Sequence, residues 1–257
     1  MKMLWASAAA GVLLAGTLSA SATTVNLITA PTEVSLGDAI FRTTDIQPTG
    51  TGVIDPFLRV QGNGVVQGYN TDAGNNALDN NNKDILAGYT NSVKLSTLSK
   101  TTINSVDYYG FLLDINQEKS DPYLTLNEIK IYQTSTGTPT GYNGTTFTGD
   151  SSAYLAYDLG AGNSVELNYL LNPGSGAGDM LLFVKASNFT SSNEYITLFS
   201  KFGDPNKDND GFEEWAAFTS TTNKPPGGDP DLTPLPSAAL SGMSLLGCLG
   251  IARRRSR

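Results

Sequence analysis

The sequence contains no histidine and only one cysteine, Cys248. Without histidine the chain cannot build a Ser-His-Asp or Cys-His catalytic arrangement, a His-ligated metal site or an imidazole pH switch. A single cysteine cannot form a disulfide within the chain, and Cys-rich zinc sites are excluded as well. Paired carboxylates are the acid-base chemistry that this composition leaves open.

Charge is also scarce, because charged residues make up 16% of the chain, against about a quarter in typical globular domains. Turn-forming residues are abundant instead, with 27 glycines and 12 prolines among 257 residues. The length suits one large domain or two small ones. This composition is typical of a secreted β protein and not of a helical cytosolic enzyme.

Short apolar or alternating segments, separated by Gly- and Asn-containing turns, run through the body of the chain. No segment of the body keeps a helical period for three turns. We therefore expect an all-β fold, an antiparallel β-sandwich of jelly-roll type, over residues 23–218. The expected strands are 25–28, 39–43, 57–61, 65–69, 93–95, 108–115, 124–133, 154–158, 164–171, 180–186 and 195–201.

The N-terminus has the three parts of a secretory signal peptide. Lys2 gives a positive start, residues 4–18 are apolar, and Ala20 and Ala22 place small residues where signal peptidase selects them. This pattern predicts a signal helix over residues 1–22 and a mature chain that begins at Thr23. The alternative is an uncleaved amphipathic helix.

The C-terminus follows a different pattern. A Pro/Gly-rich spacer over 219–233 leads to Pro234, Leu235 and Pro236, and then to an uncharged run over 237–252. As a helix this run would measure about 24 Å, somewhat less than a hydrocarbon core of about 30 Å. The arginine cluster 253–255 follows, and Arg257 ends the sequence. The positive-inside rule keeps this cluster in the cytoplasm, so the run predicts a temporary membrane anchor.

This order of proline motif, apolar span and arginine cluster (Arg253, Arg254 and Arg255) resembles the PEP-CTERM sorting signal, in the variant with Pro-Leu-Pro. The resemblance implies recognition of the tail 234–257 by an exosortase, a membrane-embedded cysteine protease of Gram-negative-type bacteria that make exopolysaccharide. It also implies that the chain is anchored in the inner membrane for a time, and then released to the cell surface or the extracellular matrix. Leu235 replaces the usual Glu, so the motif does not specify the exosortase subtype.

The body also resembles a recurring group of uncharacterised PEP-CTERM proteins. The group is defined by its sorting tail and brings no activity with it. The matching segments keep a consistent order over most of the mature chain: 50–57, 68–72, 111–117, 174–180 and 212–216.

Processing changes the charge balance. Removal of both terminal segments takes away five of the 16 cationic residues (Lys2 and the four tail arginines) and none of the 24 acidic residues, leaving a net charge of about −13. Nucleic acid and anionic membrane surfaces are poor partners for such a domain, and divalent cations or cationic groups are better ones. We expect contact with the membrane only through the tail before cleavage.

One loop has the residue pattern of a calcium site. Asn206, Asp208 and Asp210 place oxygen ligands on alternate residues, and Gly211 follows at the turn, as in an EF-hand-like loop. The twelfth position is Ala217, so the bidentate Glu is missing. Any Ca²⁺ affinity should then lie in roughly the 10⁻⁴–10⁻³ M range of extracellular modules. The alternative, which the pattern favours, is a solvated acidic turn.

Several carboxylates lie near the ends of expected strands and could flank a glycosidic bond in pairs. The alternative, which is more common, is that these carboxylates belong to turns and strand edges and form hydrogen bonds at the surface. Tyr89, Tyr108, Tyr109 and Tyr142 could stack on sugars if they were exposed together, whereas Trp215 suits the core. The carboxylates in question are Asp55, Asp72, Asp114, Glu128 and Asp158.

Together these patterns predict a non-enzymatic exported protein of the cell surface or matrix, associated with exopolysaccharide and biofilm. Its processing partners would be signal peptidase and an exosortase. A carbohydrate-binding or adhesin module for extracellular polysaccharide is the first alternative, and a small carboxylate-dependent glycosidase is the second. The glycosidase would need two carboxyl groups across a groove, about 5–5.5 or 6.5–9.5 Å apart.

Overall fold

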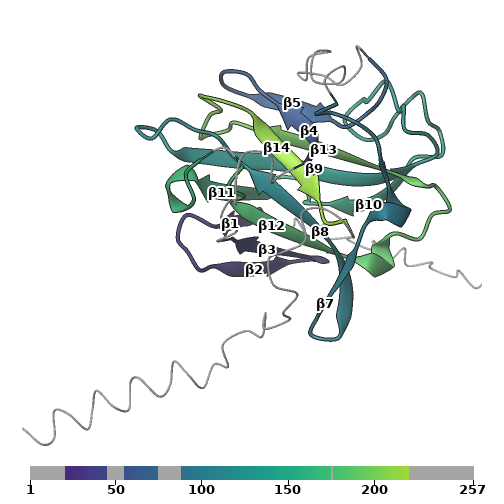
Figure 1. The fold of residues 1–257 in the computed structure, drawn as a ribbon, viewed down its shortest axis with the longest axis horizontal. Coiled ribbons are helices and arrows are strands. Elements are labelled where there is room, and N and C mark those ends of the chain that lie inside the picture. Colours follow the sequence, from purple (N-terminus) through teal and green to yellow (C-terminus); the bar gives the residue numbers. More distant parts are fainter. Residues whose placement is uncertain (1–20, 45–54, 75–87, 175, 220–257) are drawn as a thin grey trace, which may run out of the picture.

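The computed structural model describes residues 21–44, 55–74, 88–174 and 176–219. In this part of the chain almost all regular structure is β-strand, arranged in two sheets (Figure 1). The expected all-β sandwich is therefore confirmed. The predicted signal helix up to Ala20, the spacer from residue 220 and the sorting residues 234–236 and 253–255 lie outside the described residues.

The first sheet contains seven strands. Its main path runs β1 (Thr24–Asn26), β11 (Ser164–Asn168), β9 (Tyr123–Thr134), β13 (Tyr195–Phe202) and β5 (Val66–Tyr69), with β10 (Tyr154–Asp158) beside β9 and β6 (Val93–Lys94) beside β13. The pair β1–β11 is parallel, and the other pairs in this sheet are antiparallel.

The second sheet also contains seven strands, and all its pairs are antiparallel. Its main path runs β2 (Glu33–Leu36), β3 (Ala39–Thr43), β12 (Met180–Lys185), β8 (Val106–Asp114), β14 (Glu213–Ala217) and β4 (Pro56–Val60), with β7 (Lys100–Ile103) beside β8. Three short 3-10 turns complete the described elements: η1 (Leu95–Thr97), η2 (Tyr169–Leu171) and η3 (Ala186–Asn188).

Strand β9 carries an irregularity that its sequence explains. Leu124 and Leu126 face the core, and so do Ile129 and Ile131, but the two pairs are three residues apart. A regular strand would turn one pair outward, because side chains alternate between the two faces. The structure inserts Asn127 as an extra residue, since Phe202 pairs with Leu126 and Lys201 with Glu128. This bulge keeps all four apolar side chains inside.

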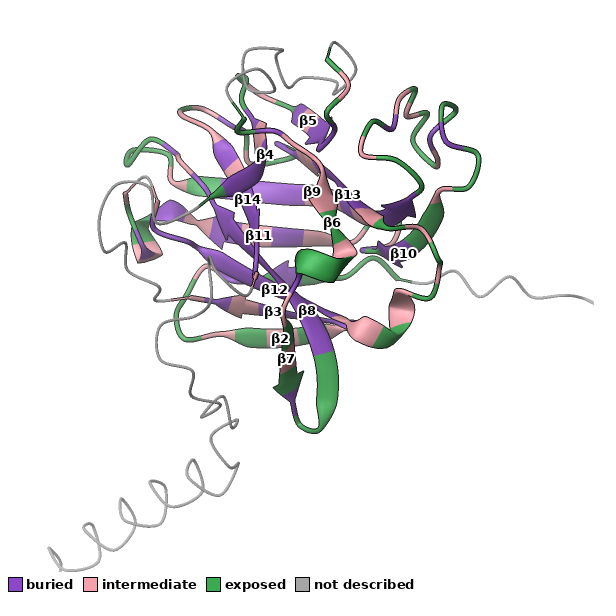
Figure 2. Cartoon of the chain, turned by 45° about the vertical axis from the view of Figure 1, so that its right-hand side comes forward, coloured by how far each residue is buried: buried purple, intermediate pink, exposed green. Residues whose placement is uncertain are grey.

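Strand β8 is buried on both faces, which accounts for its continuous apolar run. Phe111 and Leu113 belong to the main core, which takes side chains from both sheets. Leu112 and Phe218 belong to a second cluster on the outer face of the second sheet. A Cβ atom on Gly110 would lie 2.3 Å from a ring carbon of Phe218, so this close approach requires glycine. Figure 2 shows buried residues along the strand, with exposed residues at the β7–β8 hairpin.

The structure adds strands that the sequence pattern did not indicate. β2 lies at the edge of its sheet and has no fully buried residue. β7 forms a hairpin with β8 through Asn104 and Ser105, which have positive φ angles of 49° and 65°, as the two central residues of a type I′ turn require. The predicted strand over 164–171 ends at Asn168, whose side chain accepts a hydrogen bond from the Leu170 amide (3.0 Å) at the start of η2.

Candidate functional site: a buried acidic cluster

Four carboxyl groups are buried at one end of the second sheet. Asp114 ends β8, Asp179 precedes β12, Asp208 lies in the loop between β13 and β14, and Glu213 begins β14. Their exposed fractions are 2%, 6%, 0% and 0%. Since isolated buried carboxylates are costly, this cluster is the most unusual electrostatic feature of the described residues.

Asp114 and Asp179 form one half of the cluster. Asp114 Oδ2 accepts a hydrogen bond from the Gly176 amide (2.7 Å), and Asp179 Oδ2 accepts one from the Ile115 amide (2.8 Å). Burial raises the pKa of Asp114 to about 8; the Gly176 hydrogen bond opposes this shift, and the charge of Glu214 adds to it. Burial, reinforced by the charge of Asp114, also raises the pKa of Asp179 well above its usual range.

Asp208 and Glu213 form the other half. Asp208 Oδ2 accepts a hydrogen bond from the Gly62 amide (2.9 Å). Glu213 Oε1 accepts one from Gln117 Nε2 (2.6 Å), and Oε2 accepts one from the Asn116 amide (3.2 Å). Burial raises the pKa of Asp208 to about 6, although the hydrogen bond from Gly62 and the nearby polar side chain of Gln117 oppose the rise. The pKa of Glu213 is raised well above its usual range by burial and by the charge of Asp208.

Some oxygen atoms of the cluster have no hydrogen-bond partner among the described residues. They are Oδ1 of Asp114, Asp179 and Asp208, and Oε1 of Gln117. None of the ion pairs between described residues involves the four carboxyl groups. Their negative charge therefore has to be compensated by bound protons or by a cation.

The predicted calcium ligands have different surroundings. Asn206 Nδ2 donates a hydrogen bond to Glu166 Oε2 (2.5 Å), Asp208 is fully buried, and Asp210 is exposed. Among the described residues no group of three or more acidic or cysteine side chains is placed to hold a metal ion. A calcium ion shared by Asn206, Asp208 and Asp210 stays a prediction. Sequence reasoning missed Glu213 and Gln117 as neighbours of Asp208, because their contacts form only when distant segments meet.

Of the carboxylates considered for glycoside hydrolysis, Asp114 belongs to the buried cluster and Asp55 is exposed. Asp72 accepts hydrogen bonds from the amide and hydroxyl groups of Ser92, both 2.7 Å long. Asp158 accepts one from the Gly160 amide (2.8 Å). Asp158 thus stabilises a local turn, whereas Asp72 links two segments that lie 20 residues apart in the chain.

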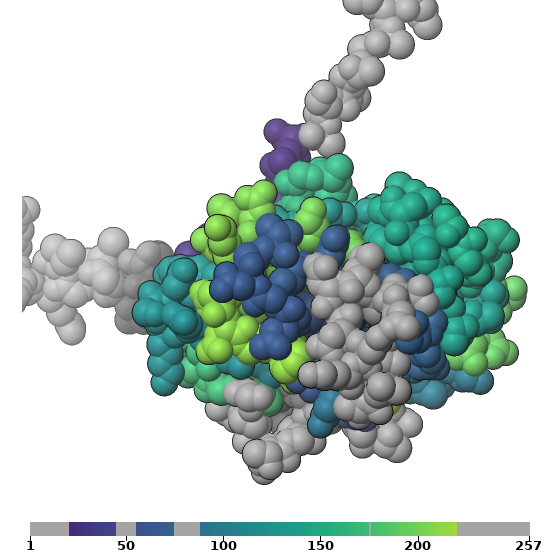
Figure 3. Space-filling view, turned by 90° about the horizontal axis from the view of Figure 1, so that it is seen from above, coloured from purple at the N-terminus to yellow at the C-terminus, as the bar shows by residue number. Residues whose placement is uncertain are grey.

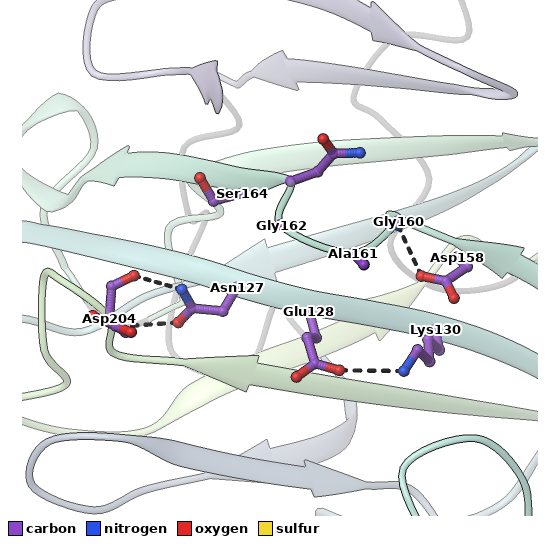
Figure 4. Close-up of a pocket in the computed structure, with 10 residues that line it drawn as sticks. Asn127, Glu128, Lys130, Asp158, Gly160, Ala161, Gly162, Ser164 and Asp204 are labelled. Atoms are coloured by element: carbon purple, nitrogen blue, oxygen red, sulfur yellow. Dashed lines mark hydrogen bonds and ion pairs between the residues drawn. The ribbon is translucent and has the colours of Figure 1, made fainter. Parts of the chain in front are cut away.

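Glu128 and Asp158 share a pocket of about 520 Å³ beside the β9 bulge (Figure 4). The bulge residue Asn127 bonds the main chain of Asp204 at the rim, and Glu128 pairs with Lys130 (3.2 Å). No aromatic residue belongs to the lining, which consists of Asn127, Glu128, Lys130, Asp158, Gly160, Ala161, Gly162, Asn163, Ser164 and Asp204.

The tyrosines considered for sugar stacking do not share an exposed face. Tyr108 and Tyr109 are buried. Tyr142 packs against Phe199, with ring centroids 4.5 Å apart. Tyr89 is 45% exposed. Trp215 is fully buried in the main core, as we expected from the sequence.

Among the described residues, no helix has both the length and the apolar character needed to cross a membrane. No protein family model, curated protein or solved structure matches the chain.

Proposed function

We propose that this protein is a non-enzymatic component of the bacterial cell surface or extracellular matrix, exported by its signal peptide and released by an exosortase. One observation carries the proposal: every described strand lies between the two predicted cleavage points in the sequence. β1 begins at Thr24, directly after the predicted cleavage point, and β14 ends at Ala217, directly before the spacer. Removal of both segments would leave every described strand in place.

The strand pairing supports a jelly roll for the released domain. Four antiparallel pairs are nested in sequence: β4 with β14, β5 with β13, β8 with β12, and β9 with β11. The outermost of these pairs joins β4 with the last described strand, β14, and the innermost joins β9 with β11, which only β10 separates in the chain. Consecutive pairs in this series alternate between the two sheets, as a long hairpin rolled into a sandwich would place them, and this alternation supports the proposed jelly roll.

A carbohydrate-binding role is the second candidate, and the pocket of Figure 4 favours it. Its amide, carboxylate and hydroxyl groups could bind the hydroxyl groups of a sugar. An aromatic stacking surface is missing from the lining, so any binding would be polar. Co-sedimentation with host exopolysaccharide, compared between the parent and Glu128→Gln, would test this role. Equal sedimentation of both proteins would count against the pocket.

Replacing Arg253, Arg254 and Arg255 together with Ala should impair removal of the tail. The cytoplasmic cationic cluster orients the apolar span, and its loss removes that bias. In fractionated host cells we expect the unprocessed form to accumulate. The matched control replaces the same residues with Lys and keeps the charge, so its processing should be near normal. Normal tail removal in the Ala variant would contradict the proposed role of the cluster.

A further inference from the structure

We propose that Asp208, Glu213 and Gln117 form a binding site for Ca²⁺. The site lies where the turn after β4 meets the start of β14. It differs from the loop predicted by sequence, because it uses Glu213 and Gln117 in place of Asn206 and Asp210. It also lies beyond the proposed surface role, which requires no ion.

Asp208 is held in place by its main chain and by one side-chain oxygen. Its amide and carbonyl groups bond those of Gly64, at 3.1 and 2.8 Å, and its Oδ2 accepts from the Gly62 amide. The other oxygen, Oδ1, is buried without a hydrogen-bond partner among the described residues. In Figure 3 the blue segment that contains β4 and β5 lies against the yellow-green segment that contains this loop. The position of Oδ1 is thus fixed by contacts that leave it free to bind a ligand.

Gln117 supplies a second, uncharged oxygen. Its Nε2 donates to Glu213 Oε1 (2.6 Å), which orients the amide, while its Oε1 has no partner among the described residues. The Gln117 side chain is 1% exposed, so bulk solvent does not reach this oxygen. Buried polar atoms in folded proteins are nearly always paired with protein, water or an ion. An unpaired amide oxygen next to two carboxyl groups points to a cation and not to an anion.

The ligand set suits a hard cation of flexible coordination. Ca²⁺ takes six to eight oxygen ligands from carboxylates, amide oxygens, main-chain carbonyls and water, whereas Mg²⁺ demands a near-ideal octahedron. Two carboxylates and one amide leave part of the shell to main-chain carbonyls and water, because no third acidic side chain joins them. We therefore expect a Kd of about 10⁻⁴–10⁻³ M, in the range of extracellular modules.

A bound proton is the competing occupant. Asp208 and Glu213 could share one proton and leave the cluster without an ion. Ca²⁺ binding distinguishes the two states, since a shared proton produces no response to calcium at fixed pH.

The direct test is luminescence of Tb³⁺ bound in place of Ca²⁺. Trp215 follows Glu213 by two residues on the same face of β14, about 7 Å along the strand, so it can excite a bound Tb³⁺ ion. We expect sensitised emission from the purified protein that Ca²⁺ displaces with the Kd above. Glu213→Gln and Asp208→Asn should each raise that Kd at least tenfold. The matched control Asp210→Asn, an exposed position of the same loop, should leave it unchanged.

Thermal melts in EGTA and in about 1 mM CaCl₂ give an independent readout. We expect a rise of roughly 1–6 °C in the parent, no rise in Glu213→Gln, and an unchanged rise in Asp210→Asn. The absence of both Tb³⁺ emission and a calcium shift in the parent would overturn the proposal, whether or not any variant folds. A calcium response that is kept in Glu213→Gln but lost in Asp210→Asn would also overturn it, in favour of the loop predicted by sequence.

Discussion

Raising the pH from about 5 to about 9 should weaken the folded domain, and Asp114 should account for a large part of the loss. Burial raises its pKa from the ordinary 3.8 to about 8. Between these values the folded state holds a proton that the unfolded state releases, so the free energy of unfolding falls as the pH rises. At about 1.4 kcal/mol per unit, the roughly three units between pH 5 and the pKa of the folded state correspond to a loss on the order of 4 kcal/mol.

The measurement is urea unfolding at several pH values in EGTA, for the parent and for Asp114→Asn. Asn stays uncharged and can still accept the Gly176 hydrogen bond, so the variant should depend less on pH and resist more urea than the parent at pH about 9. The free energy of unfolding of the variant should still fall somewhat with pH, because Asp179 and Glu214, the other groups that face Asp114, are unchanged. Asp107→Asn is the control at an exposed position of β8. A parent that gains stability between pH 5 and 9 would contradict this account of the cluster.

Truncating Trp215 should have the second large effect. Its side chain is fully buried in the core that joins the two sheets, and Trp-to-Ala replacements in cores typically cost about 3–5 kcal/mol. We expect Trp215→Ala to lower the free energy of unfolding by about that amount, measured by circular dichroism in urea.

Leu170→Ala is the matched control, since Leu170 is 47% exposed in η2. It should change stability by at most about 0.5 kcal/mol. A loss of less than 1 kcal/mol in Trp215→Ala would mean that the two sheets do not depend on this side chain for their packing.

Much of the fold could be predicted because its longest strands carry clear patterns. The apolar run 111–115 and the near-alternation over 124–132 both correspond to strands, β8 and β9. The break in that alternation at Asn127 is the bulge itself. β2 and β7 could not be predicted in the same way. Both are four-residue edge segments, and together they have one fully buried residue, Ile103.

The candidate site was only partly predictable. Asp208 stood out through the spacing of acidic residues in its loop, but a local pattern cannot show that a side chain is turned inward. Its neighbour Gln117 lies about 90 residues earlier in the chain, and sheet pairing brings it close to Glu213. The burial of Glu213 could not be predicted from the sequence, because it depends on contacts with Asn116 and Gln117 in the segment after β8.

The most direct test of the proposed role is the intact mass of the protein recovered from the surface or matrix of its native host. We expect a chain that begins at Thr23, because Ala20 and Ala22 supply the small residues that signal peptidase selects, and that lacks the arginine cluster at 253–255 after cleavage near Pro234. A recovered mass that includes Met1, or one that extends to Arg257, would contradict it.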